Sequence, residues 1–189
     1  MKIIAGEFKD RRLETPENYD IRPTSSRIRE SVFNLLMYEI EDAFFVDLFA
    51  GTGAVGLEAL SRGARKCLFC DSDRTSIAII KRNAAACRAE DRCRIIAGDF
   101  MKALRSVKEK VDVFFIDPPY ATDLITRSLE AVDSLDLLAS NGIIIAEHDK
   151  RDGSPERVGG LVRYREKKYG RVMLSFYARE DSAYVRGEE

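Results

Sequence analysis

Apolar residues are arranged along the chain in short runs that alternate with longer amphipathic stretches. Five apolar runs predict buried strands, because nearly every position in them is hydrophobic; they cover residues 44–49, 67–70, 94–97, 111–116 and 142–146. Apolar residues at helical spacing predict one helix before the first run and one after each of the first four runs; these cover residues 24–39, 51–62, 75–88, 100–107 and 122–138. The alternation predicts an α/β fold with a doubly wound, mostly parallel sheet.

The last part of the chain breaks this alternation. Residues 161–168 and 172–177 both have an extended pattern, and Tyr169-Gly170 lies between them. This arrangement predicts an antiparallel C-terminal hairpin at the edge of the sheet. A parallel sheet closed by such a hairpin is the class I (Rossmann-like) methyltransferase fold, and we expect one domain over residues 1–189.

The first part of the chain is predicted to be a short extended arm. It covers residues 1–21, in which residues 3–4 and 12–13 are expected to pair as a hairpin. Thr24, directly after Pro23, is the expected N-cap of the first helix.

Composition limits the class of protein. The chain has 189 residues, a formal net charge of −1 and no apolar run near the ~20 residues that a membrane helix needs. Its first residues become polar too early for a signal peptide. We therefore expect a cytoplasmic monomer that does not enter a membrane.

Two basic stretches stand out against the nearly neutral total charge. Residues 22–29 hold three arginines and no acid, and residues 163–171 hold five basic residues with Glu166 as their only acid. Such stretches fit contact with nucleic-acid phosphates, and a solvated surface explains them equally well.

Metal chemistry is not expected. Cys67 and Cys70 have CxxC spacing, but they lie an odd number of positions apart in a predicted strand and so point to opposite faces. We interpret the four cysteines as small core or surface residues. His148 is the only histidine, which excludes a multi-histidine site; we expect a surface or loop position for it, with a pocket position as the alternative.

A glycine-rich turn follows the first predicted strand and opens a helix. Its candidate cofactor-contact residues are Asp47, Phe49, Ala50, Gly51, Thr52, Gly53 and Gly56. Glycines let a ligand approach the backbone closely, and the helix start behind them offers free N–H groups. This spacing fits a dinucleotide as well as S-adenosylmethionine.

Acidic residues lie within or directly after the first three strands, and one of them, Asp47, favours S-adenosylmethionine, whereas the ribose contact expected for Asp71 fits both cofactors. Asp47 lies within the first strand, where a carboxylate suits a cationic amino-acid tail better than a pyrophosphate. Asp71, with Asp73 as the alternative, follows the second strand and would hold a ribose diol. Asp99 follows the third strand and is either an acceptor for an adenine amino group or a helix cap.

Asp117-Pro118-Pro119-Tyr120 directly follows the fourth strand and points to methylation of an aromatic amine. The lone pair of such a nitrogen is delocalised into its ring, so a site must localise it by accepting hydrogen bonds from both N–H groups. The Asp117 carboxylate and the Pro118 carbonyl can each accept one, since Pro119 holds Pro118 extended. Tyr120 offers a flat face on which a base can stack.

With these residues in view, the chain closely resembles the bacterial RsmD family over nearly its whole length. The resemblance is carried by residues 3–9, 22–34, 47–64 and 117–120, and Arg22-Pro23-Thr24-Ser25-Ser26-Arg27-Ile28-Arg29-Glu30 is its most specific stretch. It implies methylation of guanine N2 in 16S ribosomal RNA of the small subunit or of an assembly intermediate. It also implies that Asp117 and Tyr120 form the target-base pocket, and that Arg22, Arg27 and Arg29 help to hold RNA.

Other functions fit parts of the pattern. An adenine-N6 DNA methyltransferase could use the same turn after the fourth strand, although 189 residues leave little room for a target-recognition region. Methylation of a protein glutamine more often uses Asn where this chain has Asp117. A nicotinamide-dependent oxidoreductase would leave residues 117–120 unexplained, and a non-catalytic RNA-binding module would need neither motif.

Overall fold

The computed structural model describes residues 1–16 and 25–187. The chain divides into two compact units, Met1–Phe100 and Met101–Glu189. The glycine-rich turn at residues 51–56 belongs to the first unit, and residues 117–120 belong to the second.

The first unit contains three parallel strands in the order β3-β2-β1. They are β1 (Phe44–Leu48), β2 (Lys66–Asp71) and β3 (Cys93–Ala97). Every residue of β1 is buried, as its continuous apolar run predicts. Asp71 pairs with Ala97 at the carboxyl ends of β2 and β3, so both strands deliver their following loops to the same edge.

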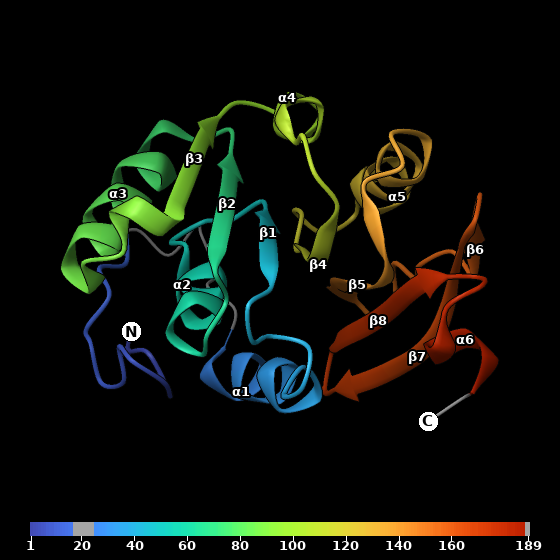
Figure 1. Cartoon of the computed structure of the whole chain (residues 1–189), viewed down its shortest axis with the longest axis horizontal. Helices are drawn as coiled ribbons and strands as arrows, with labels where there is room; N and C mark the ends of the chain where they lie inside the picture. Colours follow the sequence, from blue (N-terminus) through green and yellow to red (C-terminus); the bar gives the residue numbers. More distant parts are fainter. Residues whose placement is uncertain (17–24, 188–189) are drawn as a thin grey trace. The chain divides into compact units, whose positions relative to one another are not determined.

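The helices of the first unit are α1 (Ser26–Leu35), α2 (Ala54–Ser61), α3 (Arg74–Cys87) and the 3₁₀ turn η1 (Glu90–Arg92). α2 packs on β1 and β2, and α3 packs on β2 and β3 (Figure 1). The bounds of the three strands predicted for this part of the chain are confirmed to within one residue at each end. The expectation of a buried strand was wrong for β3, in which no residue is fully buried, because β3 is the edge strand of the sheet order.

The first helix is shorter than its apolar pattern predicts. Its N-cap is Ser25, whose Oγ accepts a hydrogen bond from the Ile28 N–H at 3.2 Å; the expected cap, Thr24, lies outside the described residues. The helix ends at Leu35 instead of near Glu39. Leu36 and Ile40 are both buried at helical spacing, but the chain between them is a turn, which explains the wrong boundary.

Close contact between α2 and β2 depends on Gly56. A Cβ atom at this position would lie 2.3 Å from Phe69 Cε1 and 2.6 Å from Cys67 Sγ. Both neighbours belong to β2, so the helix can approach the strand only because the side chain is missing.

Gly56→Ala is therefore expected to lower the free energy of unfolding by about 1–3 kcal/mol, because the added methyl group overpacks this contact. Urea denaturation followed by circular dichroism measures the change. Combining the substitution with Cys67→Ala shortens one of the two clashing side chains and should restore part of the lost stability. Equal stability of Gly56→Ala and the unmodified protein would contradict this packing.

The N-terminal arm docks onto α2 as a hairpin. Lys2 and Arg12 form an antiparallel bridge, which confirms the expected pairing with a shift of one residue. Ile4 and Ala5 donate their backbone N–H groups to the Glu58 carboxylate at 2.8 and 3.0 Å. The arm over residues 1–16 is thus part of the first unit's packed structure.

The second unit begins within α4 (Phe100–Ser106) and contains the remaining strands: β4 (Val111–Ile116), β5 (Leu138–Asp149), β6 (Arg157–Val158), β7 (Leu161–Tyr169) and β8 (Val172–Arg179). β4 and β5 are parallel, and β5-β8-β7-β6 continue the sheet in antiparallel order. The predicted hairpin is confirmed as β7–β8, drawn in orange to red in Figure 1.

Two helices complete the second unit, α5 (Leu124–Ser134) against β5 and β6, and α6 (Ala183–Arg186) against β7 and β8. The prediction of one helix through Leu138 was wrong, because Leu138 already belongs to β5. Val111 N–H donates to the Leu137 carbonyl at 2.9 Å, so this segment joins the strand ladder and leaves the helix.

Candidate active site

The glycine turn of the first unit has a backbone that depends on left-handed conformations. Gly51 and Gly53 have φ values of 54° and 74°, and Phe49 also has a positive φ of 64°. The turn is closed by a hydrogen bond of 2.7 Å from Gly53 N–H to the Ala50 carbonyl. Ala50 N–H donates to the Cys70 carbonyl at 2.8 Å, which ties the turn to the end of β2.

Asp47 braces the start of α2. Its carboxylate is buried and accepts a hydrogen bond from Gly56 N–H at 3.0 Å. Such a bond satisfies one of the N–H groups that every helix start leaves unpaired within the helix. Contact between Asp47 and a cationic amino-acid tail stays a prediction.

Asp71 and Asp73 have different roles. Asp71 is half-buried and accepts hydrogen bonds from Gly51 N–H and Asp73 N–H, both at 2.8 Å. Burial raises the pKa of Asp71, and these backbone bonds oppose the rise. Asp73 caps α3 by accepting from Ser76 N–H at 2.7 Å, and that bond lowers the pKa of Asp73. The geometry favours Asp71 as the residue directed at the glycine turn.

Other predicted residues surround this turn. Phe49 packs against Phe100 with 5.8 Å between ring centroids, and Asp99 lies exposed just before α4. Thr52 is buried, and its carbonyl accepts a hydrogen bond of 2.9 Å from the Asn83 side chain. Asn83 also bonds the backbone of Glu14, a structural role that no sequence motif signals.

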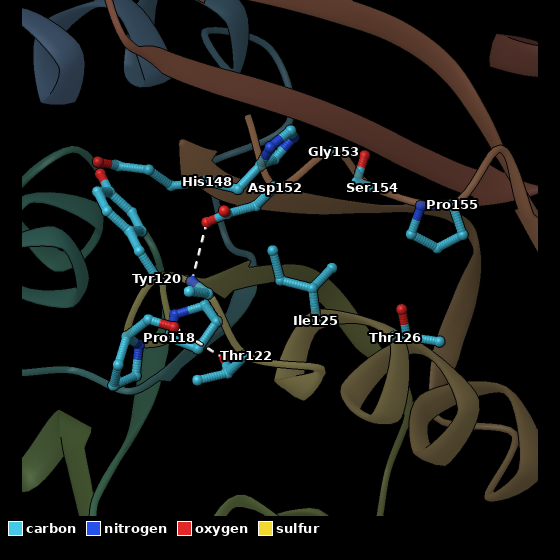
Figure 2. Close-up of a pocket in the computed structure, with 13 residues that line it drawn as sticks. Pro118, Tyr120, Thr122, Ile125, Thr126, His148, Asp152, Gly153, Ser154 and Pro155 are labelled. Atoms are coloured by element: carbon cyan, nitrogen blue, oxygen red, sulfur yellow. Dashed lines mark hydrogen bonds between the residues drawn. The ribbon is translucent and has the colours of Figure 1, made fainter. Parts of the chain in front are cut away.

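The 117–120 loop leaves β4 in the second unit and borders a pocket of about 400 Å³. Pro118 and Tyr120 line the pocket, and the Tyr120 side chain is 40% exposed. Figure 2 shows Pro118 and Tyr120 on one side and Ser154 and Pro155 on the other. Asp117 is half-buried at the end of β4 and does not itself border this pocket.

A hydrogen bond fixes the far end of this loop. Ala121 N–H donates to the Asp152 carboxylate at 2.9 Å, and Ala121 has a positive φ of 58° (Figure 2). Thr122 Oγ1 donates to the Pro119 carbonyl at 2.8 Å. The strained backbone at Ala121 is thus held by Asp152 next to the predicted base-binding residues.

Two further pocket residues come from the carboxyl end of β5. Glu147 is 4% exposed, and His148 is also buried. His148 Nε2 lies 2.9 Å from Ser175 Oγ and Nδ1 lies 3.0 Å from the Asp149 carbonyl. The expectation of a surface or loop histidine was therefore wrong, because His148 pairs with Met173 inside the sheet. Their place at a strand's carboxyl end could have identified both residues.

The structure bears differently on the three arginines that were predicted to hold RNA. Arg27 is exposed on α1, and Arg22 lies outside the described residues. Arg29 is fully buried: its guanidinium donates to the Lys2 carbonyl at 2.5 Å and approaches Glu58 within 3.5 Å. The prediction of an RNA contact for Arg29 is corrected, because this cation is enclosed by the N-terminal arm and α2.

The basic stretch at residues 163–171 lies on the β7–β8 hairpin. Arg163 is mostly buried and donates to the Ser154 carbonyl at 2.7 Å, so it supports the pocket wall. Arg165, Lys168 and Arg171 are exposed, and Arg171 pairs with Asp149 at 3.2 Å. Only the exposed members of this stretch are available to a nucleic-acid backbone.

The four cysteines all lie in the first unit and are free thiols. Cys67, Cys70 and Cys87 are buried and Cys93 is half-buried, which confirms their interpretation as small packing residues. Burial raises the pKa of Cys93 to about 12 and also raises that of Cys67. These groups therefore stay protonated at neutral pH.

The fold and the two motifs define a class I methyltransferase. The family model described as "Conserved hypothetical protein 95" matches residues 1–178, and the chain belongs to this family, the RsmD family of the sequence analysis. The Escherichia coli protein "Ribosomal RNA small subunit methyltransferase D" is 33% identical over 180 residues, covering 95% of this chain and 90% of its own.

Two further similarities extend over nearly the whole chain. The Bacillus subtilis protein YlbH is 34% identical over 180 residues, covering 94% of this chain and 98% of its own. The solved structure of the Escherichia coli protein yhhF has a TM-score of 0.86 and 31% identity, covering 96% of this chain and 99% of its own. Among the described residues, no helix combines the length and the hydropathy required to cross a bilayer.

Proposed function

We propose that this protein transfers a methyl group from S-adenosylmethionine to the exocyclic N2 amine of a guanine in 16S ribosomal RNA. The observation that carries the proposal is the 117–120 loop, whose Pro118 and Tyr120 border a pocket large enough for a nucleobase. The relative named for small-subunit ribosomal RNA supports the substrate class. We propose further that both units belong to one methyltransferase domain.

The residues of the glycine turn fit the cofactor. Gly51 and Gly53 add no Cβ atoms to the turn, and the Asp71 carboxylate is fixed beside it by Gly51 N–H. Asp71 would accept hydrogen bonds from the ribose hydroxyls, and Asp99 would accept one from the adenine amino group. Asp47 would hold the amino-acid tail. When bound, S-adenosylmethionine supplies an electrophilic methyl group on a sulfonium sulfur.

The second unit would position the acceptor. Asp117 and the Pro118 carbonyl accept hydrogen bonds from the two amine hydrogens, which turns the nitrogen lone pair out of the base ring. The carboxylate also stabilises the positive charge that develops on the amine during transfer. Tyr120 stacks on the base after it leaves its own stack, and Asp152 keeps the loop in place through Ala121.

RNA would be held by cations. Arg27 on α1 and exposed members of the β7–β8 hairpin such as Arg165 would supply positive charge for phosphate contacts. Arg22, which lies outside the described residues, is proposed to contribute to the same contacts. The substrate would be the small ribosomal subunit or an assembly intermediate, and the enzyme would act as a cytoplasmic monomer.

A panel of substrates tests the proposal. The protein is incubated with methyl-labelled S-adenosylmethionine and, separately, small ribosomal subunits, naked ribosomal RNA and duplex DNA. Label is expected in small-subunit RNA. Label confined to DNA would replace the proposal by an adenine-N6 DNA methyltransferase, and binding of NADH without binding of S-adenosylhomocysteine would point to an oxidoreductase.

The affinity of the cofactor site for S-adenosylhomocysteine should also depend on pH. Ionised Asp71 is the better acceptor, and its pKa is raised, so affinity for S-adenosylhomocysteine is full above that pKa and falls as the pH drops through it. Isothermal titration between pH 7 and about pH 4 measures this fall. It should begin at a higher pH than for an ordinary aspartate, and Asp71→Asn should weaken binding and flatten the profile.

Asp73→Asn is the matched control for this measurement. The pKa of Asp73 is lowered by its bond to Ser76 N–H, and asparagine caps helices as well as aspartate does. The variant should keep the pH profile of the unmodified protein. An unchanged profile in Asp71→Asn would remove Asp71 from the site.

A further inference from the structure

Glu147 is a buried carboxylate beside the proposed binding pocket of the target base. It lies in β5, borders the same pocket as Pro118 and Tyr120, and is 4% exposed. A buried carboxylate is rare without a structural or functional reason. Glu147 belongs neither to the glycine turn at residues 51–56 nor to the 117–120 loop.

Strand register sets the position of Glu147 relative to the amine site. β4 and β5 are parallel, and Ile116 pairs with Ala146. One residue further along the chain are Asp117, which directly follows β4, and Glu147, which still belongs to β5, so the two residues follow adjacent partners of the sheet. Glu147 also pairs with Leu174 of β8, which holds its backbone inside a sheet rather than in a loop.

The chemistry of guanine requires a second acceptor beside its amine. On the Watson–Crick edge, N1–H lies next to the N2 amine, and both groups are donors. Adenine and 2-aminopurine instead have an unprotonated N1, which repels a carboxylate. We propose that Glu147 accepts the N1–H of the target guanine while Asp117 and Pro118 hold its amine, and so selects guanine. This inference rests on the proposed function of the 117–120 loop.

The test compares two bases that share the N2 amine. Small ribosomal subunits are reconstituted with RNA that carries either guanosine or 2-aminopurine riboside at the mapped target position, and methylation rates are measured for each. The unmodified protein is expected to prefer guanosine by about 100-fold, because a site built to accept N–H rejects an analogue that lacks it. Intrinsic differences between the bases cancel when the ratio is compared across variants.

Glu147→Gln should narrow this preference by at least about tenfold, since the glutamine amide can donate to the N1 of 2-aminopurine. Glu180→Gln is the charge-matched control: Glu180 is a surface carboxylate paired with Arg157, and its loss should leave the ratio unchanged. Thermal unfolding and S-adenosylhomocysteine affinity confirm that each variant is folded.

The outcomes distinguish a failure of the proposed role of Glu147 from a failure of the proposed methyltransferase function. A wild-type ratio in folded Glu147→Gln would overturn the role of Glu147 and leave the amine site intact. Failure of the unmodified protein to methylate guanosine would overturn the proposed function itself and this inference with it. If Glu147→Gln does not fold, Glu147→Asp replaces it; its withdrawn carboxylate should slow guanosine methylation about tenfold, and an unchanged rate would exclude the contact.

Discussion

Replacing Asp117 by alanine is expected to lower kcat about 100- to 1,000-fold and to leave the affinity for S-adenosylhomocysteine close to that of the unmodified protein. The reason is that Asp117 is proposed to orient the acceptor amine and to stabilise charge that exists only during transfer. It has no proposed role in holding the cofactor. Single-turnover methylation of small subunits gives the rate, and isothermal titration gives the affinity.

Asp123→Ala is the control for the loss of a carboxylate near the loop. Asp123 is exposed, precedes α5 and pairs with Arg127 at 3.7 Å. Its removal should leave both rate and affinity unchanged. If Asp117→Ala methylated as fast as Asp123→Ala, the amine-orienting role of Asp117 would be wrong.

Glu58→Ala is expected to have the largest effect on stability, about 3–5 kcal/mol in the free energy of unfolding. Glu58 and Arg29 are fully buried, and burial lowers the pKa of Arg29 while Glu58 opposes that effect. Removing Glu58 leaves the Arg29 cation without its counter-ion. It also deprives the Ile4 and Ala5 N–H groups of their acceptor.

Guanidinium denaturation measures this loss, and limited proteolysis reports whether residues 1–16 detach first. Glu7→Ala is a suitable control, since Glu7 also pairs an arginine, Arg92, but is mostly exposed. It should change the free energy of unfolding little. Equal stabilities for the two variants would show that the buried ion pair does not anchor the arm.

Strand positions in this fold were predictable, because buried parallel strands are apolar at nearly every position. The boundaries of helices were less so. Leu36 and Ile40 continue the helical spacing of apolar residues, although the chain between them is a turn. Leu137 and Leu138 also fit a helix, but in the structure Leu137 accepts a hydrogen bond from Val111 of β4 and Leu138 begins β5. Such local patterns do not reveal which backbone partner a segment finds in the folded chain.

In the candidate site, too, some features were predictable from the sequence and others were not. The turn after β1 and the loop after β4 were predictable because glycine spacing and the Asp117-Pro118-Pro119-Tyr120 sequence each carry a chemical requirement. Arg29 was misjudged because a basic residue in a basic stretch looks solvated, and its carboxylate partner is 29 positions away in the sequence. The place of His148 near the end of a strand was predictable, but its burial was not, because the burial depends on pairing between β5 and β8 that the local pattern does not reveal.

Mass spectrometry of the modified nucleoside tests the central claim most directly. Small subunits are methylated by the unmodified protein and by Asp117→Ala, and the digested RNA is analysed for methylated nucleosides. The account predicts N2-methylguanosine at one position with the unmodified protein and a large loss of it with the variant. A methyl group found on a ring nitrogen, on ribose or on adenine N6 would contradict the proposed grip on a guanine amine.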